Sequence, residues 1–148
     1  MCFVTALLIV ACGDKSQETI TTQRKQADLT VGSTKFYLNS CHSLTGVFNH
    51  NGTIKTKVIL TLPTRPLSVC NNKQSQLNFD GTHLTVKICR TAFGAGGCGV
   101  EKYRTTDFEN WQEYIGITWH GNEQYEAWRQ LGSNSSKADD ITKVVPVH

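Results

Sequence analysis

Three carboxylates in the last third of the chain are the side chains best suited to catalysis. Asp107, Glu109 and Glu113 lie within one short segment, and if that segment is helical, Glu109 and Glu113 share one face. Paired carboxylates can divide the roles of general acid and general base, as in enzymes that cleave glycosidic bonds. Like charges four residues apart are commoner as a solvated helix face. We therefore expect no catalytic residue, and keep a small carbohydrate-active enzyme as the alternative.

The sequence contains no other motif for nucleophilic or metal-dependent catalysis. Neither G-x-S-x-G nor H-E-x-x-H occurs, and the five histidines are scattered. The run Gly94–Gly99 matches G-x-G-x-x-G by letter, but no strand leads directly into it and no βαβ unit follows. We interpret this run as a turn, and we expect neither a cofactor nor a bound metal.

Six cysteines indicate an oxidising compartment, because cytosolic proteins rarely hold disulfides. No C-x-x-C pair and no zinc-ligand spacing offers a metal site instead. The four cysteines in the body of the chain, Cys41, Cys70, Cys89 and Cys98, allow three pairings. Cys89 and Cys98 flank a glycine-rich turn, which favours a local disulfide and leaves Cys41 for Cys70. The two other pairings stay open.

Basic residues are concentrated in the middle of the chain. Residues 31–100 contain seven basic side chains and one acidic one, whereas residues 101–148 contain five basic and eight acidic ones. Charged ends of this kind stay in water. We expect Lys55, Lys57 and Lys87 on the solvated face of strands, where they would attract an anionic cell-envelope polymer. Neutralisation by the acidic C-terminal segment is the alternative, and no dedicated nucleic-acid motif is present.

All three tryptophans, Trp111, Trp119 and Trp128, lie in the acidic C-terminal part. Together with nearby tyrosines they could form a platform on which sugar rings stack. Aromatic clusters of this kind more often belong to a core. Carbohydrate stacking and core packing both stay open for these residues.

Alternating polarity predicts short strands joined by tight turns. Leu84, Val86 and Ile88 alternate with polar residues, as expected for a strand with one buried face. Asp80 and Gly81 precede this strand and suit a hairpin turn. A second hairpin is expected at the Asn51-Gly52 pair, and the strand after it should place alternate residues on one face: Ile54, Thr56, Val58, Leu60 and Leu62.

Two helical patterns follow residue 100. Thr106-Asp107-Phe108-Glu109 has the form of a capping box, and residues 123–131 carry an aromatic stripe ended by Gly132. We expect one short C-terminal helix over residues 123–131. Residues 105–111 also resemble the S-x-D-x-x-x-W turn of β-propeller glycosidases and sialidases, in which the motif is a structural hairpin.

The first eleven residues are uncharged and almost wholly apolar. This length suits the hydrophobic region of a signal peptide and is too short to span a bilayer. The segment ends in Ile9-Val10-Ala11-Cys12, which resembles the lipobox of bacterial lipoproteins. The resemblance implies that Cys12 carries lipid and that the membrane is a partner through this anchor. Because Gly13 follows, it also implies an outer-membrane lipoprotein of the cell envelope, facing the periplasm or the surface.

The length of the chain and its pattern predict one small domain. We expect a signal peptide over 1–11, a lipidated cysteine and flexible tether over 12–30, a single β-rich domain over 31–132 and a loose tail over 133–148. The fold class is all-β or β-dominated: a small disulfide-linked antiparallel sheet, sandwich or partly open barrel, with one short C-terminal helix.

The predicted function is that of an exported, membrane-anchored lipoprotein. It would act as a non-catalytic binding or accessory module for an anionic cell-envelope polymer or a protein partner. The alternatives are a small carbohydrate-active enzyme, a carbohydrate-binding domain, or a periplasmic inhibitor of a hydrolase.

Overall fold

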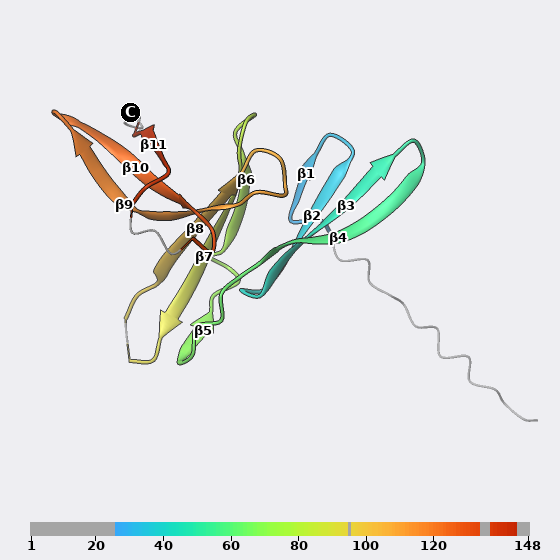
Figure 1. Ribbon diagram of the computed structural model, residues 1–148. Coiled ribbons are helices and arrows are strands. Elements are labelled where there is room, and N and C mark those ends of the chain that lie inside the picture. The colour runs from blue at the N-terminus through green and yellow to red at the C-terminus, as the bar shows by residue number, and fades with distance from the viewer. Residues whose placement is uncertain (1–25, 95, 134–136, 145–148) are drawn as a thin grey trace, which may run out of the picture.

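The computed structural model describes residues 26–94, 96–133 and 137–144, and in this part of the chain all regular structure is antiparallel β-strand. The all-β prediction is confirmed. Two sheets are formed (Figure 1). Sheet A has the order β1-β2-β3-β4, from β1 (Leu29–Val31), β2 (Thr34–Asn39), β3 (Ser43–His50) and β4 (Thr53–Thr61). Sheet B has the order β11-β10-β9-β8-β7-β5, with β6 also paired to β7; its strands are β5 (Ser68–Cys70), β6 (Gln76–Phe79), β7 (Leu84–Ala92), β8 (Gly99–Thr105), β9 (Gln112–His120), β10 (Glu123–Gln130) and β11 (Asp140–Lys143).

Both predicted hairpins are present. Asn51 and Gly52 join β3 to β4 and have φ values of 49° and 81°. A tight turn that suits the twist of two strands needs positive φ at both central residues, and these two residue types adopt it readily. Between β6 and β7, the Asp80 carboxylate accepts the backbone N–H groups of Thr82 and His83 at 2.8 and 2.7 Å. Each turn therefore sets the register of the strands that it joins.

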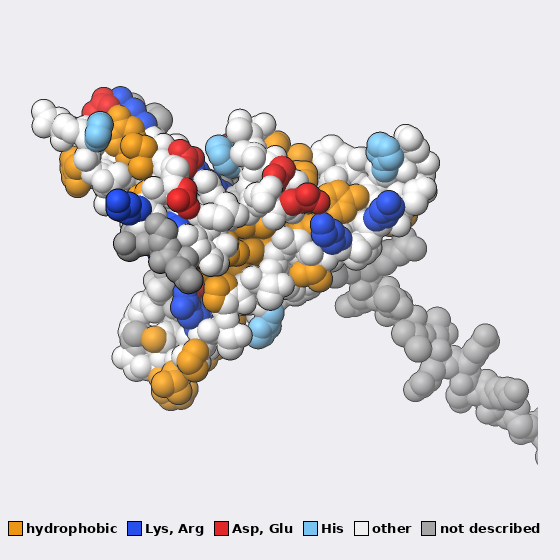
Figure 2. All heavy atoms as spheres, in the orientation of Figure 1, with side chains coloured by type: hydrophobic (Ala, Val, Ile, Leu, Met, Phe, Trp, Pro, Cys, Tyr) orange, Lys and Arg blue, Asp and Glu red, His pale blue; other side chains and the backbone are white. Residues whose placement is uncertain are grey.

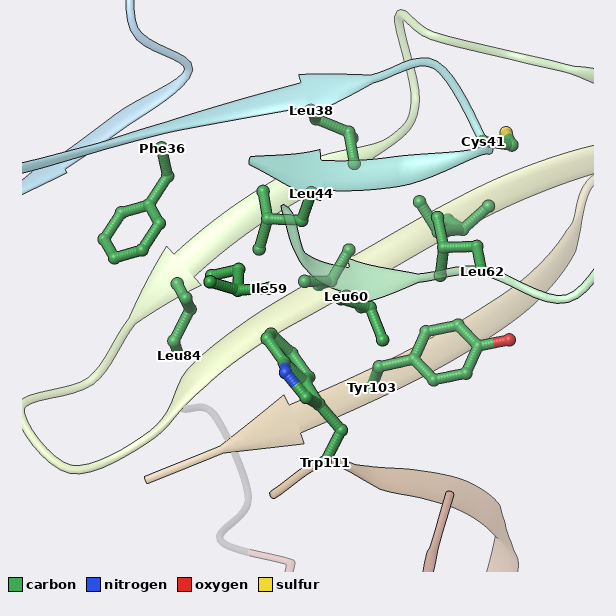
Figure 3. Close-up of a cluster of buried hydrophobic side chains, with 12 residues drawn as sticks. Phe36, Leu38, Cys41, Leu44, Ile59, Leu60, Leu62, Leu84, Tyr103 and Trp111 are labelled. Carbon is green, nitrogen blue, oxygen red and sulfur yellow. The ribbon is translucent and has the colours of Figure 1, made fainter. Parts of the chain in front are cut away.

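The core lies between the two sheets. Leu84, Val86 and Ile88 are fully buried, as the alternation of β7 predicts, and they meet Phe36 and Leu44 of sheet A. Figure 3 shows these apolar side chains converging from strands of both sheets. Complete burial of one such side chain contributes about 1.5–3 kcal/mol, so this shared core holds the sheets together.

A β-bulge in β4 changes which residues face the core. Leu44 pairs with Leu60 but Thr45 pairs with Val58, so Ile59 is an extra residue in the ladder. Leu60 is buried, whereas Ile54 and Val58 are 68% and 54% exposed. The predicted single apolar face of this strand is therefore wrong.

The same bulge changes the position of two lysines. Lys55 and Lys57 alternate with Ile54 and Val58, so they lie on the face of β4 that carries the buried Ile59. Both side chains are exposed to solvent, as expected. The face that carries them, however, is the one on which sheet B packs, and was expected to be the opposite one.

The predicted C-terminal helix is wrong, because residues 123–130 form strand β10. This strand pairs along its whole length with β9, and Gly121 (φ 61°) lies in the turn between them. Pairing with a neighbouring strand overrides the helical propensity of the segment. Four residues of the expected loose tail, Asp140–Lys143, add β11 to the outer side of β10.

Strands β9, β10 and β11 form an arm that diverges from the rest of sheet B (Figure 1). Only two residue pairs join β8 to β9. Buried Arg104 ties the arm to β8: its guanidinium donates to Asp140 and Thr142 at 2.5 and 2.6 Å and lies 4.1 Å over the ring of Trp128. Burial lowers the pKa of Arg104, and the Asp140 carboxylate opposes that effect.

Candidate functional site

The three candidate carboxylates do not form a catalytic pair. Residues 106–111 form a turn between β8 and β9, so the helix suggested by the capping box is wrong and Glu109 and Glu113 do not share a helix face. Glu109 lies 3.3 Å from Lys57 of sheet A. Glu113 lies in β9 and accepts from Arg129 of β10 at 2.6 Å. The two side chains are thus engaged with different partners on different elements.

Asp107 has a structural role in this turn. Its Oδ1 atom accepts the backbone N–H groups of Glu109 and Asn110 at 2.9 and 2.8 Å, and its Oδ2 atom accepts from the Asn110 side chain at 2.7 Å. These donors, the Asn110 amide first, hold the pKa of Asp107 well below its usual range. A carboxylate held ionised in this way is a turn-forming group and is unsuited to donate a proton at neutral pH.

The turn that contains Asp107 and the neighbouring strands of sheet A line an open groove of about 580 Å³, which we call the lysine groove. Its apolar surface comes from Phe48, Ile59 and Phe108, and its charged rim from Lys55, Lys57 and Glu109. Figure 2 shows acidic and basic side chains gathered beside apolar surface on this side of the molecule. The groove therefore brings together two of the three predicted anion-binding lysines.

The aromatic wall of the lysine groove is fixed from both sheets. The ring of Phe108 lies 6.2 Å from that of Phe48 and 5.3 Å from that of buried Phe36. Phe108 has a φ of 64°, which is rare for a large side chain and is held here by donation of its N–H group to Thr105 Oγ1 at 3.0 Å. At Gly46 of β3, a Cβ atom would meet the Phe48 ring at 2.7 Å. The Phe48 ring thus lies directly over Gly46, and the Phe108 ring packs on buried Phe36.

The two lysines of the lysine groove differ in their pairing with other charged groups of the protein. Among the described residues, Lys55 has no hydrogen-bond or ion-pair partner, and Lys57 has only the exposed contact with Glu109. Exposed ion pairs of this kind contribute about 0–1 kcal/mol and exchange readily with other partners. Asp107 is already saturated by donors of its own turn. The groove can therefore offer one free and one weakly held ammonium group beside apolar surface.

Lys87 does not belong to this groove. It lies in β7, directly opposite Lys102 of β8, and lines a smaller polar cleft of about 250 Å³ in sheet B. In that cleft Lys102 donates to Glu126 at 2.5 Å and lies 4.8 Å from the Tyr114 ring. The predicted single stripe of Lys55, Lys57 and Lys87 is therefore divided between two sites. Sequence reasoning missed the polar cleft, whose only signal was the polar face of β7.

The tryptophans are also divided. Trp111 and Trp128 are buried, at 4% and 2% exposed, so of the two possibilities left open for them the structure shows core packing. Trp119 is 60% exposed and lines a separate hollow of about 540 Å³ with Asn122 and Gln124. One tryptophan therefore remains available at the surface.

The two favoured disulfides are present, Cys41–Cys70 and Cys89–Cys98. The first joins the loop after β2 of sheet A to β5 of sheet B. Arg90 joins the same parts of the molecule by donating to the carbonyl oxygens of Cys41 and Pro63 at 2.7 and 2.9 Å. The relative position of the sheets, which forms the lysine groove, is thus fixed covalently and by hydrogen bonds.

Glu101 is the centre of a further cluster of ionisable side chains. It accepts from Arg65, Arg90 and the hydroxyl of Tyr103, the last at 2.9 Å. Burial, with the hydrogen bond to Glu101, raises the pKa of Tyr103 well above its usual range. Every member of this cluster is engaged within the protein, so we assign it a role in stability.

The predicted lipid-bearing Cys12, the signal peptide and most of the tether lie outside the described residues. Within the described ranges, no helix has the length and apolar character to cross a membrane. Nor does this part of the chain contain a group of three or more histidine, cysteine or acidic side chains placed to hold a metal ion. Comparison with protein families, with curated proteins and with solved structures finds no significant match to this chain.

Proposed function

We propose that the protein is an exported binding module, held at a membrane by lipid on Cys12, with the lysine groove as its ligand-binding site. The lipobox-like Ile9-Val10-Ala11-Cys12 supports the anchor. The two disulfides support an oxidising compartment. The single observation that carries the binding function is the convergence of Lys55 and Lys57 with Phe48 and Phe108 in one open groove.

The chemistry of the lysine groove favours an anionic ligand that also has an apolar part. Lys55 offers an ammonium group without an internal partner among the described residues, and Lys57 can exchange Glu109 for a ligand anion. The phenylalanine rings beside them suit an apolar group, since binding sites combine apolar walls with a few polar anchors. Anionic cell-envelope polymers and acidic protein partners both have this character.

Retention on immobilised lipopolysaccharide tests the binding function. The wild type should be retained at low salt and released as salt rises, because exposed charges are screened beyond about 8 Å at physiological ionic strength. The Lys55→Glu, Lys57→Glu variant should elute much earlier, and Lys55→Glu alone should also elute earlier than the wild type. Lys87→Glu is the control matched to Lys55→Glu, since it makes the same charge change at a lysine of the other sheet that lies outside the groove. Equal loss of retention in Lys55→Glu and Lys87→Glu would mean that total charge, and not the groove, determines retention.

The lipid anchor has a separate test. In a Gram-negative host fed with radiolabelled palmitate, the wild type should become labelled, because the proposed anchor is acylated at Cys12. The Cys12→Ser variant should carry no label. Label that survives the substitution would refute lipidation at this residue and would leave the groove proposal intact.

A second candidate function, carbohydrate recognition, is favoured by the exposure of Trp119. Its indole lines a hollow together with the side-chain amides of Asn122 and Gln124. An exposed ring face next to amide donors and acceptors can stack on a sugar and hydrogen-bond its hydroxyl groups. Cell-wall glycan fragments should then change the tryptophan fluorescence of the wild type and leave that of Trp119→Ala unchanged. An identical change of fluorescence in both proteins would exclude this hollow as the sugar-binding site.

A further inference from the structure

The border of sheet A at β4 is a long unpaired edge. Most border strands of this fold are short, since β1 and β5 have three residues each and β6 and β11 have four. β4 has nine residues and pairs with β3 on one side; no other described strand pairs with its outer side (Figure 1). Short edges resist pairing with other chains, whereas long ones invite it.

The exposed part of β4 is also regular. From Thr53 to Val58 its pairing with β3 continues without a register shift, and the bulge comes only after Val58. All six residues are exposed. β9 also has a free edge beyond its short contact with β8, but that edge is interrupted by a register shift and by Gly116 at φ 139°. Bulges of this kind interrupt pairing, so β4 is the better template for an added strand.

The lysines of β4 determine which kind of strand could pair with it. In antiparallel pairing of β4 with a second copy of itself, centred on Thr56, Lys55 lies opposite Lys57 of the other copy twice. Like charges directly opposite each other destabilise such a pair. An added strand with acidic side chains at two alternate positions would instead place each of them opposite one lysine. Charge therefore disfavours self-association in this register and favours an acidic partner.

We propose that the outer edge of β4 takes up an extended acidic segment of a partner protein as a fifth strand of sheet A. The inference rests on the proposed binding function, because Lys55 and Lys57 also line the lysine groove. Main-chain hydrogen bonds to β4 supply affinity, and alternate side chains supply specificity. The segment has acidic residues at two alternate positions on the groove side. On its other side it has β-branched residues, opposite Ile54, Thr56 and Val58.

The pair between Lys57 and Glu109 competes with such a segment. Glu109 Oε1 lies 3.3 Å from Lys57 Nζ, so it occupies an ammonium group that the incoming acid would use and adds negative charge beside it. Glu109→Gln should therefore strengthen binding of the acidic segment by roughly two- to fivefold, as expected for one exposed ion pair. An apolar or sugar ligand would gain little from this substitution.

The test uses the purified protein and a short synthetic peptide in which two glutamates alternate with valine and threonine. Fluorescence anisotropy measures the affinity, and amide hydrogen exchange monitors β4. Binding should protect those backbone amides of residues 53–58 that point to the outer edge, which alternate with the amides already bonded to β3. N-methylation of the peptide backbone on its pairing edge should weaken binding by about tenfold or more, because it removes the main-chain donors. Equal affinity of the methylated peptide, or unchanged exchange in β4, would overturn strand addition.

Protein variants separate this proposal from the general one. The double variant Lys55→Glu, Lys57→Glu should no longer bind the peptide. Lys87→Glu should bind it as the wild type does, and Glu109→Gln should bind it more tightly. A wild type that binds lipopolysaccharide through the lysine groove but not the peptide would refute strand addition and leave the groove with another anionic ligand. Peptide binding without lipopolysaccharide retention would support the edge and identify protein as the ligand class. If the free wild-type protein forms a dimer that does not bind the peptide, a second copy of the chain is the partner of β4, and the proposal is overturned.

Discussion

Removal of the Asp107 carboxylate should destabilise the protein. Asp107 forms hydrogen bonds with the backbone N–H groups of Glu109 and Asn110 and with the side chains of Asn110 and Thr105, at 2.7 to 3.0 Å. Loss of an Asp that caps backbone N–H groups costs about 0.5–2 kcal/mol, and we expect the upper part of this range for Asp107→Ala because several donors lose one acceptor. For a domain of this size the melting temperature should fall by about 5–8 °C.

The charge of Asp107 makes this effect depend on pH. Hydrogen bonds lower its folded-state pKa below the ordinary value of 3.8, so its contribution is fully present above that value and is lost as pH falls through the folded-state pKa. The stability gap between wild type and Asp107→Ala should thus be constant from pH 5 to 7 and should narrow below pH 3.8. Asp107→Asn keeps one oxygen acceptor and should lose less stability than Asp107→Ala. The difference in stability between the wild type and Asp107→Asn should also narrow in acid.

Urea unfolding monitored by tryptophan fluorescence measures these differences. Glu109→Gln is the matched control two residues away, because its exposed pair with Lys57 should contribute less than about 1 kcal/mol. The reasoning is refuted if Asp107→Ala is as stable as the control at pH 7. It is equally refuted if the stability gap widens as the pH is lowered. Glycan-cleaving activity lost in an Asp107→Asn variant of normal stability would instead revive the enzymatic alternative.

The remaining predictions concern the sheets and the core. Replacing Cys41 and Cys70 by alanine should lower the free energy of unfolding by about 3–4 kcal/mol, since the bridge closes a loop with a sequence separation of 29; an unchanged urea midpoint would contradict this. Trp128→Ala should lower the free energy of unfolding by about 3–5 kcal/mol because the side chain is buried, whereas Trp119→Ala should lower it by less than about 1 kcal/mol. Similar shifts of the melting temperature in the two variants would contradict the burial of Trp128. Gly46→Ala should displace the phenylalanine ring of the lysine groove, destabilise the protein by about 1–3 kcal/mol and weaken anion retention; wild-type behaviour in both assays would mean that the ring is not needed there.

Sequence reasoning succeeded where structure is determined locally. The turn residues at Asn51-Gly52 and Asp80-Gly81 carry their own conformational preference, so both hairpins could be predicted. The alternation in β7 was equally reliable, because this strand pairs without interruption with β8. Cysteine spacing around a glycine-rich turn indicated the Cys89–Cys98 pair, and elimination then gave Cys41–Cys70.

Errors arose where pairing between strands decides the outcome. One bulge after Val58 reverses the faces of β4, and nothing in the local sequence identifies the extra residue. In β10, Tyr125 and Trp128 are three residues apart, which suggests a helix face when the segment is considered alone. In the strand they point to opposite sides, and Trp128 reaches Arg104 of β8. The Gly121-Asn122 pair between these two strands is a hairpin signal in the sequence that favours the strand over the helix.

The candidate site itself depends on contacts between distant segments. Lys55 and Lys57 reach the lysine groove because the register before the bulge places them opposite Phe48 and Gly46. Phe108 and Glu109 reach it because residues 106–111 form a turn. The capping-box and S-x-D-x-x-x-W patterns both fit those residues in sequence. The turn prevails because Thr105 and Asp107 satisfy its N–H groups and because Trp111 is buried in the core. The aspartate that suggested catalysis thus stabilises, through the N–H groups of Glu109 and Asn110, the turn that carries Phe108 into the lysine groove, so its hydrogen bonds give it a structural role.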